Sequence, residues 1–107
     1  KLRSIPLSWW VKINDKTTIG LPDIIGAAGG VPFVLELKVN ASLTKLQKYT
    51  LEQASIAGFR AFVVKPVNFN TVFDIISREA GANSSREIPQ VLYPPRALLR
   101  KLVDSIS

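Results

Sequence analysis

The stretch GLPDIIGAAGGVPFVLELKV, residues 20–39, decides the fold of this chain. Two β-prone runs flank Gly29-Gly30, a dipeptide typical of tight hairpin turns because both central residues need a positive φ. With these glycines at the turn, each residue of the first run pairs with the residue equally far along the second. The sequence therefore predicts a β-hairpin in which Asp23 lies directly opposite Glu36.

The predicted register separates charged from apolar side chains, because successive residues of a strand point to opposite faces. Lys38 follows Glu36 by two positions, so it shares a face with Glu36 and Asp23. A slip by one residue would exchange the two faces, and the apolar row therefore fixes the register. We expect that row to enter the core, and it consists of Ile24, Phe33, Leu35, Leu37 and Val39.

The opposed carboxylates need an explanation, since like charges facing each other destabilise a sheet. A divalent cation between Asp23 and Glu36 would turn repulsion into ligation, and Mg²⁺ takes oxygen ligands from one or two carboxylates and from phosphate. One interpretation is therefore a metal site with Lys38 beside it. The other is a half-exposed hairpin whose Glu36 and Lys38 face water. The register alone leaves both open.

Composition narrows the class of protein. The 107 residues, 47% hydrophobic and 21% charged, fit one globular domain. A net charge of +6 favours a polyanionic partner, nucleic acid before a membrane surface, with a generic basic surface as the alternative. The absence of cysteine and histidine excludes disulfides, Cys/His zinc sites and histidine-dependent triads. With no signal peptide or membrane-spanning run, we expect an intracellular, cytoplasmic protein.

The chain on either side of the hairpin predicts a mixed sheet. Residues 8–13, SWWVKI, alternate as a strand, with Trp10 and Lys12 on one face. A turn at 14–16 would join this strand to the hairpin as a three-stranded antiparallel meander. Residues 60–65, RAFVVK, predict a fourth strand, which a crossover helix would make parallel to its neighbour. The expected fold class is α/β, with helices flanking the sheet.

The crossover helix is expected to run from about Thr44 to Ala57. Thr44 and Gln47 fit a capping box, in which each side chain accepts from the other residue's backbone. Gln47 also lies in the first turn after the strand that carries Glu36. It therefore either faces the same site or serves only as a cap.

Two further helices are expected after the fourth strand. One should run from Asn70, as its N-cap, through Ala80, and Gly81 should close it. The last should follow Pro94-Pro95 and either cover the sheet or dock a second subunit. Its two faces are an apolar set and a basic set: Leu98, Leu99, Leu102, Val103 and Ile106 against Arg96, Arg100 and Lys101.

The hairpin motif, Pro22-Asp23 followed by Glu36-Leu37-Lys38, resembles the PD-(D/E)xK motif of a nuclease superfamily. The order of motifs is most similar to the VRR-NUC branch, and archaeal-type Holliday-junction resolvases share much of it. The likeness covers about residues 9–65, the expected core of a single domain 1–107 whose residues 66–107 form a C-terminal helical extension. Four motifs carry it in order: Gly20–Asp23, Glu36–Lys38, Thr44–Gln47 and Ala57-Gly58.

The resemblance implies a restriction-endonuclease-like core and a metal-dependent phosphodiesterase that cleaves DNA. Asp23 and Glu36 would ligate Mg²⁺ or Mn²⁺ together with the backbone carbonyl of Leu37. Lys38 would orient the attacking water and stabilise negative charge in the transition state. Gln47 would hold the site or a substrate phosphate.

The resemblance also implies partners. Lys12 matches a basic position that often precedes the PD turn, and a homodimer would suit two cuts on a duplex or junction. An origin in a phage or mobile element would fit so small a unit. The side chains expected to contact DNA are those of Lys12, Lys16, Lys45 and Lys48.

One departure from the family pattern concerns the metal site. Family members usually carry an acidic residue on a helix before the first strand, whereas this chain has no acidic residue before Asp15. The chain begins at Lys1 and contains no methionine, so we expect that helix to be missing from its N-terminus. Two functions stay open: a structure- or site-selective endonuclease, and a catalytically weak or inactive DNA-binding module on a nuclease fold.

Overall fold

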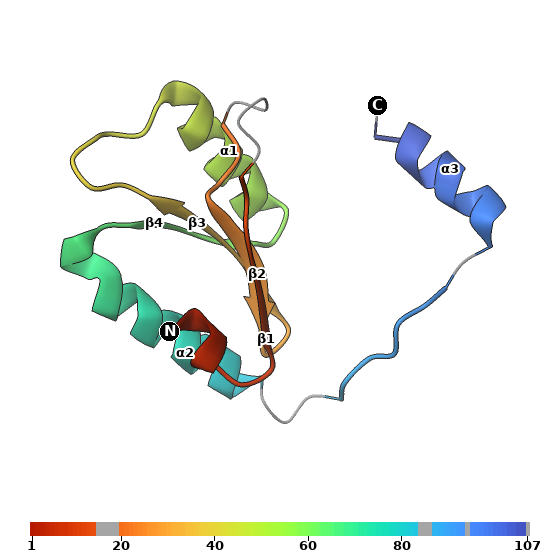
Figure 1. Ribbon diagram of the computed structural model, residues 1–107, viewed down its shortest axis with the longest axis horizontal. Coiled ribbons are helices and arrows are strands. Elements are labelled where there is room, and N and C mark those ends of the chain that lie inside the picture. The colour runs from red at the N-terminus through yellow and green to blue at the C-terminus, as the bar shows by residue number, and fades with distance from the viewer. Residues whose placement is uncertain (15–19, 84–86, 94, 107) are drawn as a thin grey trace.

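The computed structural model describes residues 1–14, 20–83, 87–93 and 95–106. A four-stranded mixed sheet lies at its centre, in the order β1-β2-β3-β4 (Figure 1). The first three strands pair antiparallel and β4 pairs parallel with β3, which confirms the predicted α/β class and sheet. The strands are β1 (Ser8–Lys12), β2 (Ile24–Ala28), β3 (Val31–Leu37) and β4 (Arg60–Val64).

The hairpin turns where the sequence predicts. Gly29 and Gly30 have φ values of +58° and +84°, which suit a turn that needs two positive φ angles. Ile24 pairs with Leu35, and the same register, continued one residue further from the turn, places Asp23 opposite Glu36. The predicted turn at 14–16 lies outside the described residues, apart from residue 14.

Helices cover the two faces of the sheet unequally. Helix α1 (Lys45–Ile56) connects β3 to β4 and packs on β4, whereas α2 (Phe69–Ala82) packs on the opposite face (Figure 1). Two short 3₁₀ turns, η1 (Leu2–Ser4) and η2 (Pro66–Asn68), precede β1 and α2. The crossover helix and the parallel fourth strand are therefore both confirmed.

The main core lies between the sheet and α2. It consists of buried side chains from the residue after η1, from the four strands and from α2: Ile5, Trp10, Ala28, Phe33, Leu35, Val64, Val72, Ile76 and Ala80. Two members of the predicted apolar row are not buried, since Leu37 is 44% and Val39 73% exposed. Leu37 is the last residue of β3 and borders an apolar cavity together with Phe69 and Val72 of α2, and Val39 lies past the end of the strand.

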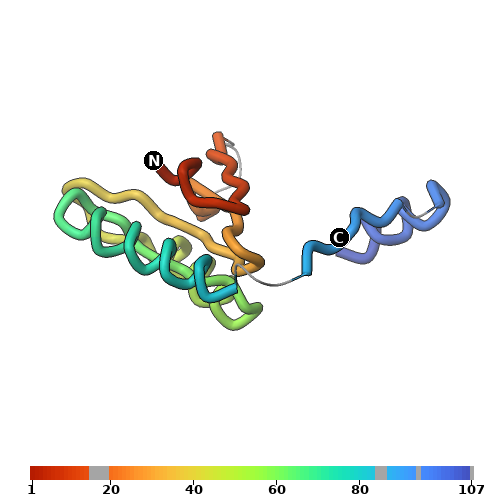
Figure 2. Tube along the Cα trace, turned by 90° about the horizontal axis from the view of Figure 1, so that it is seen from below, coloured from red at the N-terminus to blue at the C-terminus, as the bar shows by residue number. Residues whose placement is uncertain are grey.

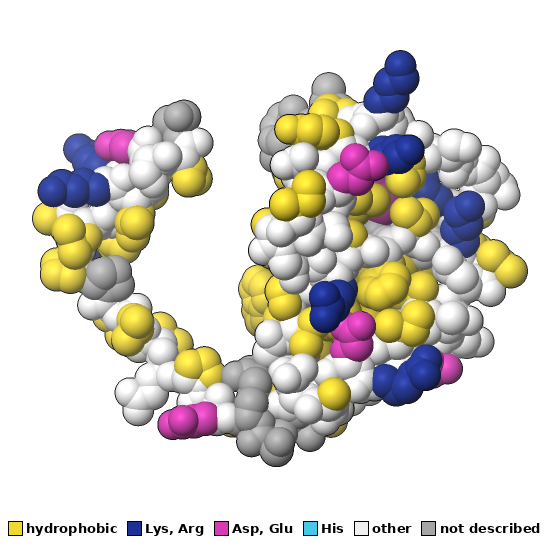
Figure 3. Space-filling model, turned by 180° about the vertical axis from the view of Figure 1, so that it is seen from behind, with side chains coloured by type: hydrophobic (Ala, Val, Ile, Leu, Met, Phe, Trp, Pro, Cys, Tyr) yellow, Lys and Arg dark blue, Asp and Glu magenta, His cyan; other side chains and the backbone are white. Residues whose placement is uncertain are grey.

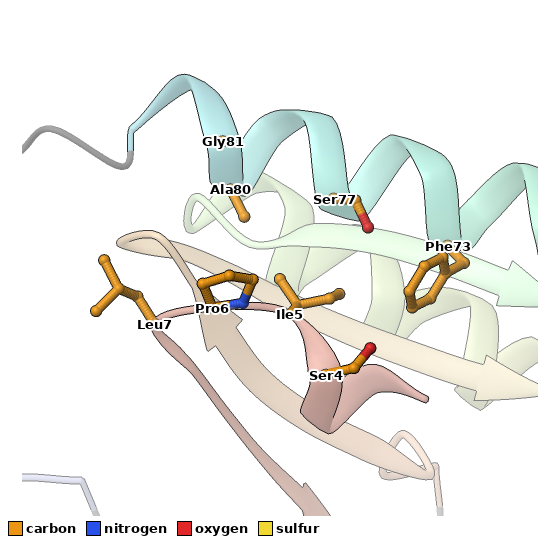
Figure 4. A pocket seen from close by; sticks show the side chains of 8 residues that line it. All are labelled: Ser4, Ile5, Pro6, Leu7, Phe73, Ser77, Ala80 and Gly81. Atoms are coloured by element: carbon orange, nitrogen blue, oxygen red, sulfur yellow. The ribbon is translucent and has the colours of Figure 1, made fainter.

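The N-terminal segment closes one side of this core. Ile5 and Pro6 lie opposite Ser77 and Ala80 of α2, and together they border a cavity of about 190 Å³ (Figure 4). Leu7 takes a φ of +53°, and its carbonyl accepts a 2.9 Å hydrogen bond from the N–H of Gly29. The hairpin turn thereby fixes the entry of the chain into β1.

Helix α2 differs from its prediction at both ends. It begins at Phe69 with Asn68 as N-cap, and it continues through Gly81 to Ala82. The Asn68 side chain accepts from the Lys65 N–H at 2.7 Å and donates to the Val63 carbonyl at 3.0 Å, so it is held against the backbone just before η2 and the helix begins directly after it. Because α2 supplies core residues, the packed body extends past residue 65, the expected boundary of the core.

Helix α3 (Arg96–Asp104) stands apart from the rest of the molecule (Figures 1 and 2). None of its residues is buried, so it does not cover its own sheet. The prediction of a helix after Pro95 is confirmed, whereas one of the two roles offered for it is wrong. Within the described ranges, no helix has the length and apolar character needed to cross a membrane.

Candidate metal centre

Glu36 lies on the central strand β3, on the face that α1 approaches. Glu36 is only 3% exposed, and among the described residues it is the one charged residue that is buried. Val34, two positions earlier on the same face, is also buried. The interpretation in which Glu36 faces water is therefore wrong, and the structure instead holds a carboxylate inside the protein.

Two polar side chains approach the same oxygen of Glu36. Gln47 donates from Nε2 to Oε1 at 3.1 Å, and the ammonium of Lys38 lies 4.0 Å from that oxygen. The Lys38 side chain is itself only 15% exposed. The second oxygen, Oε2, is buried and accepts no hydrogen bond from the described residues. An unsatisfied buried carboxylate oxygen costs about 1–3 kcal/mol or more, so it needs a partner.

Asp23 is held by the backbone of the neighbouring strand. Its Oδ2 accepts a 2.7 Å hydrogen bond from the N–H of Leu37, and its own N–H donates to the Leu35 carbonyl at 3.1 Å. The regular β2–β3 pairing ends at Ile24, so the Leu37 N–H has no strand partner on that side. Sequence reasoning missed this contact, although the end of a predicted ladder next to an acidic residue is the signal that indicates it.

The surroundings raise the pKa of Glu36. Burial is the largest cause, because it disfavours the charged carboxylate, and the nearby charge of Asp23 acts in the same direction. Lys38 opposes both by favouring the ionised form. Burial and the neighbouring charge therefore outweigh Lys38, and the net shift of the Glu36 pKa is upward.

Gln47 has both of the roles that the sequence left open. Its backbone N–H donates to Thr44 Oγ1 at 3.1 Å, while its Oε1 accepts from the Thr44 N–H at 3.0 Å. The capping box leaves Nε2 free to reach Glu36. One side chain therefore starts helix α1 and also binds the buried carboxylate.

The donor set fits a hard divalent cation. The free Oε2 of Glu36 and the carboxylate of Asp23 are anionic oxygens, the ligand type that Mg²⁺ and Mn²⁺ take. Among the described residues no third acidic side chain joins them. A cation here would complete its shell with water, backbone carbonyl and substrate oxygen, which is usual for Mg²⁺.

The lysines expected to contact DNA fall in different places. Lys45 and Lys48 are exposed on the first turns of α1, the helix that brings Gln47 to the site. Lys12 pairs with Ile24 and thus lies on the face of Leu35, opposite to the carboxylates. Lys12 therefore lies on the neighbouring strand pair but on the other face of the sheet from the carboxylates, and Lys16 lies outside the described residues.

Comparison with known proteins leaves the site as the basis for any functional conclusion. No protein-family model matches the chain, and no curated protein or solved structure matches it either.

Proposed function

We propose that this chain is a metal-dependent DNA endonuclease on a restriction-endonuclease-like core, cutting branched or junction DNA or a specific site. One observation carries the proposal: a carboxylate that is 3% exposed has an unpaired oxygen beside a second carboxylate. A protein that had no use for these charges would gain by replacing Glu36 with an apolar residue. The arrangement is reasonable if a cation regularly binds there.

The chain's own residues prepare the site for phosphodiester hydrolysis. Leu37 N–H fixes one oxygen of Asp23 and Gln47 fixes one oxygen of Glu36, so both acids are held in a set orientation, and Oε2 of Glu36 has no hydrogen-bond partner among the described residues. Bound Mg²⁺ or Mn²⁺ would supply Lewis acidity and lower the pKa of a water ligand. The resemblance adds the Leu37 carbonyl as a further ligand.

Lys38 would stabilise negative charge that develops on the phosphate. Its Nζ lies 4.0 Å from Glu36 Oε1 and its side chain is mostly shielded from solvent, where an electrostatic interaction is stronger than in water. We therefore assign Lys38 an electrostatic role and not that of a general base.

The substrate proposed is DNA because the chain carries a net charge of +6. Lys45 and Lys48 are exposed at the end of α1 that holds Gln47, so they would meet the phosphates next to the cleaved bond. Binding should then weaken steeply as salt rises.

A second candidate is a DNA-binding module without turnover. This candidate is favoured by the small number of acidic side chains at the site, since only two carboxylates come together among the described residues. In that case the chain would bind DNA with the same salt dependence, but added metal would produce no cleavage.

The test is a panel of branched and linear DNAs incubated with the protein, with and without Mg²⁺ or Mn²⁺. We expect Glu36→Ala to abolish metal-dependent cleavage and Lys38→Ala to slow it by on the order of 10²–10³-fold, the usual loss for one transition-state donor. Glu52→Ala, which removes an exposed acid from α1, is the matched control and should cleave normally. Cleavage that survives in Glu36→Ala would refute the assignment, and DNA binding without cleavage in the parent would favour the second candidate.

A further inference from the structure

Helix α3 exposes an apolar face that no described residue of its own chain buries. We call it the α3 face, and its side chains are between 45% and 87% exposed: Leu98, Leu99, Leu102, Val103 and Ile106. The segment that leads to it continues the same character, with Leu92 and Tyr93 86% and 89% exposed. Figure 3 shows hydrophobic side chains gathered along this segment and on α3. Exposed apolar surface of this extent indicates an interaction site.

The sheet leaves a second apolar surface open. Helix α1 packs mainly on β4, at the edge of the sheet away from β1, and no described helix packs mainly on the β1 part of the same face. The register places Trp9 beside Ala27 and Val11 beside Ile25, on the face opposite to the Trp10 core. Trp9 is 63% exposed although it is one of the largest apolar side chains in the chain. We call these four residues the open sheet face.

The exposed area of the whole chain is too large for a compact monomer. The chain exposes 8228 Å², whereas a compact monomer of 11.8 kDa exposes about 5,900 Å². Its radius of gyration of 15.7 Å likewise exceeds the value of about 13 Å for a compact domain of this length. The excess of roughly 2,300 Å² is well above the ~800 Å² that each partner contributes to a standard interface.

We propose that two copies of this chain form a dimer in which the α3 face of each copy packs on the open sheet face of the other. Both surfaces belong to the same chain, so the contact repeats under two-fold symmetry and closes. In its own chain α3 stands away from the sheet, at the end of an extended segment that separates the two surfaces (Figures 1 and 2). The basic residues Arg100 and Lys101 lie on the other side of α3 and stay in water.

This dimer does not depend on the proposed nuclease function. Neither surface includes Asp23, Glu36 or Lys38, so mass and cleavage are separate measurements. If the chain dimerises but does not cleave DNA, the dimer proposal stands and the proposed nuclease function fails. If it cleaves DNA as a monomer, the nuclease function stands and the dimer proposal fails.

The first experiment measures mass in solution by light scattering. Leu98→Glu combined with Leu102→Glu should convert a dimeric parent into a monomer. Arg100→Gln combined with Lys101→Gln is the matched control, because it also lowers the net charge by two but changes the other side of α3. It should stay dimeric. A monomeric parent, or equal dissociation in both double variants, would overturn the proposal.

The second experiment locates the contact, using the absence of native cysteine in the chain. Ala27→Cys and Leu102→Cys are made in separate chains, one of them tagged, and the chains are mixed and oxidised. We expect the mixture to form a tagged–untagged disulfide in good yield, with little from Lys101→Cys mixed with Ala27→Cys. A Leu102→Cys chain that links mainly to itself would show α3–α3 pairing, and a chain carrying both cysteines that closes only within itself would show docking on its own sheet. Either result would overturn the proposed packing of the α3 face on the open sheet face of a second copy.

Discussion

Replacing Glu36 with glutamine should separate the cost of a buried charge from the benefit of a bound cation. The amide keeps the size of the carboxylate, and its oxygen still accepts from Gln47, whose Nε2 lies 3.1 Å from Glu36 Oε1. The variant loses a buried carboxyl oxygen that has no partner among the described residues, a burden of about 1–3 kcal/mol, and it also loses the 4.0 Å contact with Lys38. Without metal we therefore expect Glu36→Gln to be more stable than the parent by about 1 kcal/mol.

Magnesium should reverse this order. A cation that binds only the folded state stabilises it by RT ln(1 + [L]/Kd), so a Kd of about 1 mM and about 10 mM Mg²⁺ give about 1.4 kcal/mol. For a domain of this size that corresponds to a rise in Tm of roughly 6–10 °C. The parent should show this rise, and Glu36→Gln should show almost none.

The measurement is thermal unfolding of the parent, Glu36→Gln and Glu52→Gln with and without Mg²⁺, at constant ionic strength. Glu52 is exposed on α1, so its variant makes the same chemical change away from the site and should respond to Mg²⁺ as the parent does. If Mg²⁺ raises the Tm of the parent and of Glu36→Gln equally, the cation does not bind at the carboxylate pair and the reasoning fails.

Further changes test the titration of Glu36, two glycines of the fold and the capping box of α1. Since the pKa of Glu36 is raised above 4.5, the metal-free folded state keeps a proton that the unfolded state loses. The free energy of unfolding in urea should therefore fall as the pH rises from 4.5 through the raised pKa of Glu36, and this fall should be absent in Glu36→Gln. A pH profile of Glu36→Gln that runs parallel to that of the parent would contradict the assignment. Gly29→Ala, at φ +58° with its added Cβ against the Ala80 backbone, should lose about 2 kcal/mol. Gly81→Ala, in open space within α2, should gain about 0.5–1 kcal/mol. Thr44→Ala and Gln47→Ala should each lose about 1 kcal/mol of stability, but only Gln47→Ala should also lower Mg²⁺ affinity in calorimetric titration; equal affinities would reduce Gln47 to a cap.

The hairpin and its opposed acids follow from the sequence because a two-residue turn sets the register by itself. Once Gly29-Gly30 is the turn, counting outward fixes every pair, and the structure confirms the positions of Asp23 and Glu36. The capping box at Thr44 is equally local, since both partners lie within one helical turn. Features that depend on neighbouring residues were therefore predictable.

Other features depend on surfaces far apart in the chain. Leu37 and Val39 continue the apolar row, but Leu37 borders a cavity beside α2 and Val39 lies past the end of β3, and no pattern in the strand states where it ends or how closely a helix packs on it. The face of Lys12 depends on the pairing of β1 with β2, and the connection between these strands is not a two-residue turn that would fix it. The unpaired oxygen of Glu36 likewise results from several elements meeting at one place.

The link through Gln47 has a consequence for the motions of the protein. If the first turn of α1 frays, Nε2 leaves the buried acid at the same moment, and water gains access to it. Assembly of the carboxylate pair and nucleation of that helix are then a single cooperative event. Amide hydrogens in the first turns of α1 should exchange at a rate set by cation occupancy, so a loosening of this helix end would release the ion.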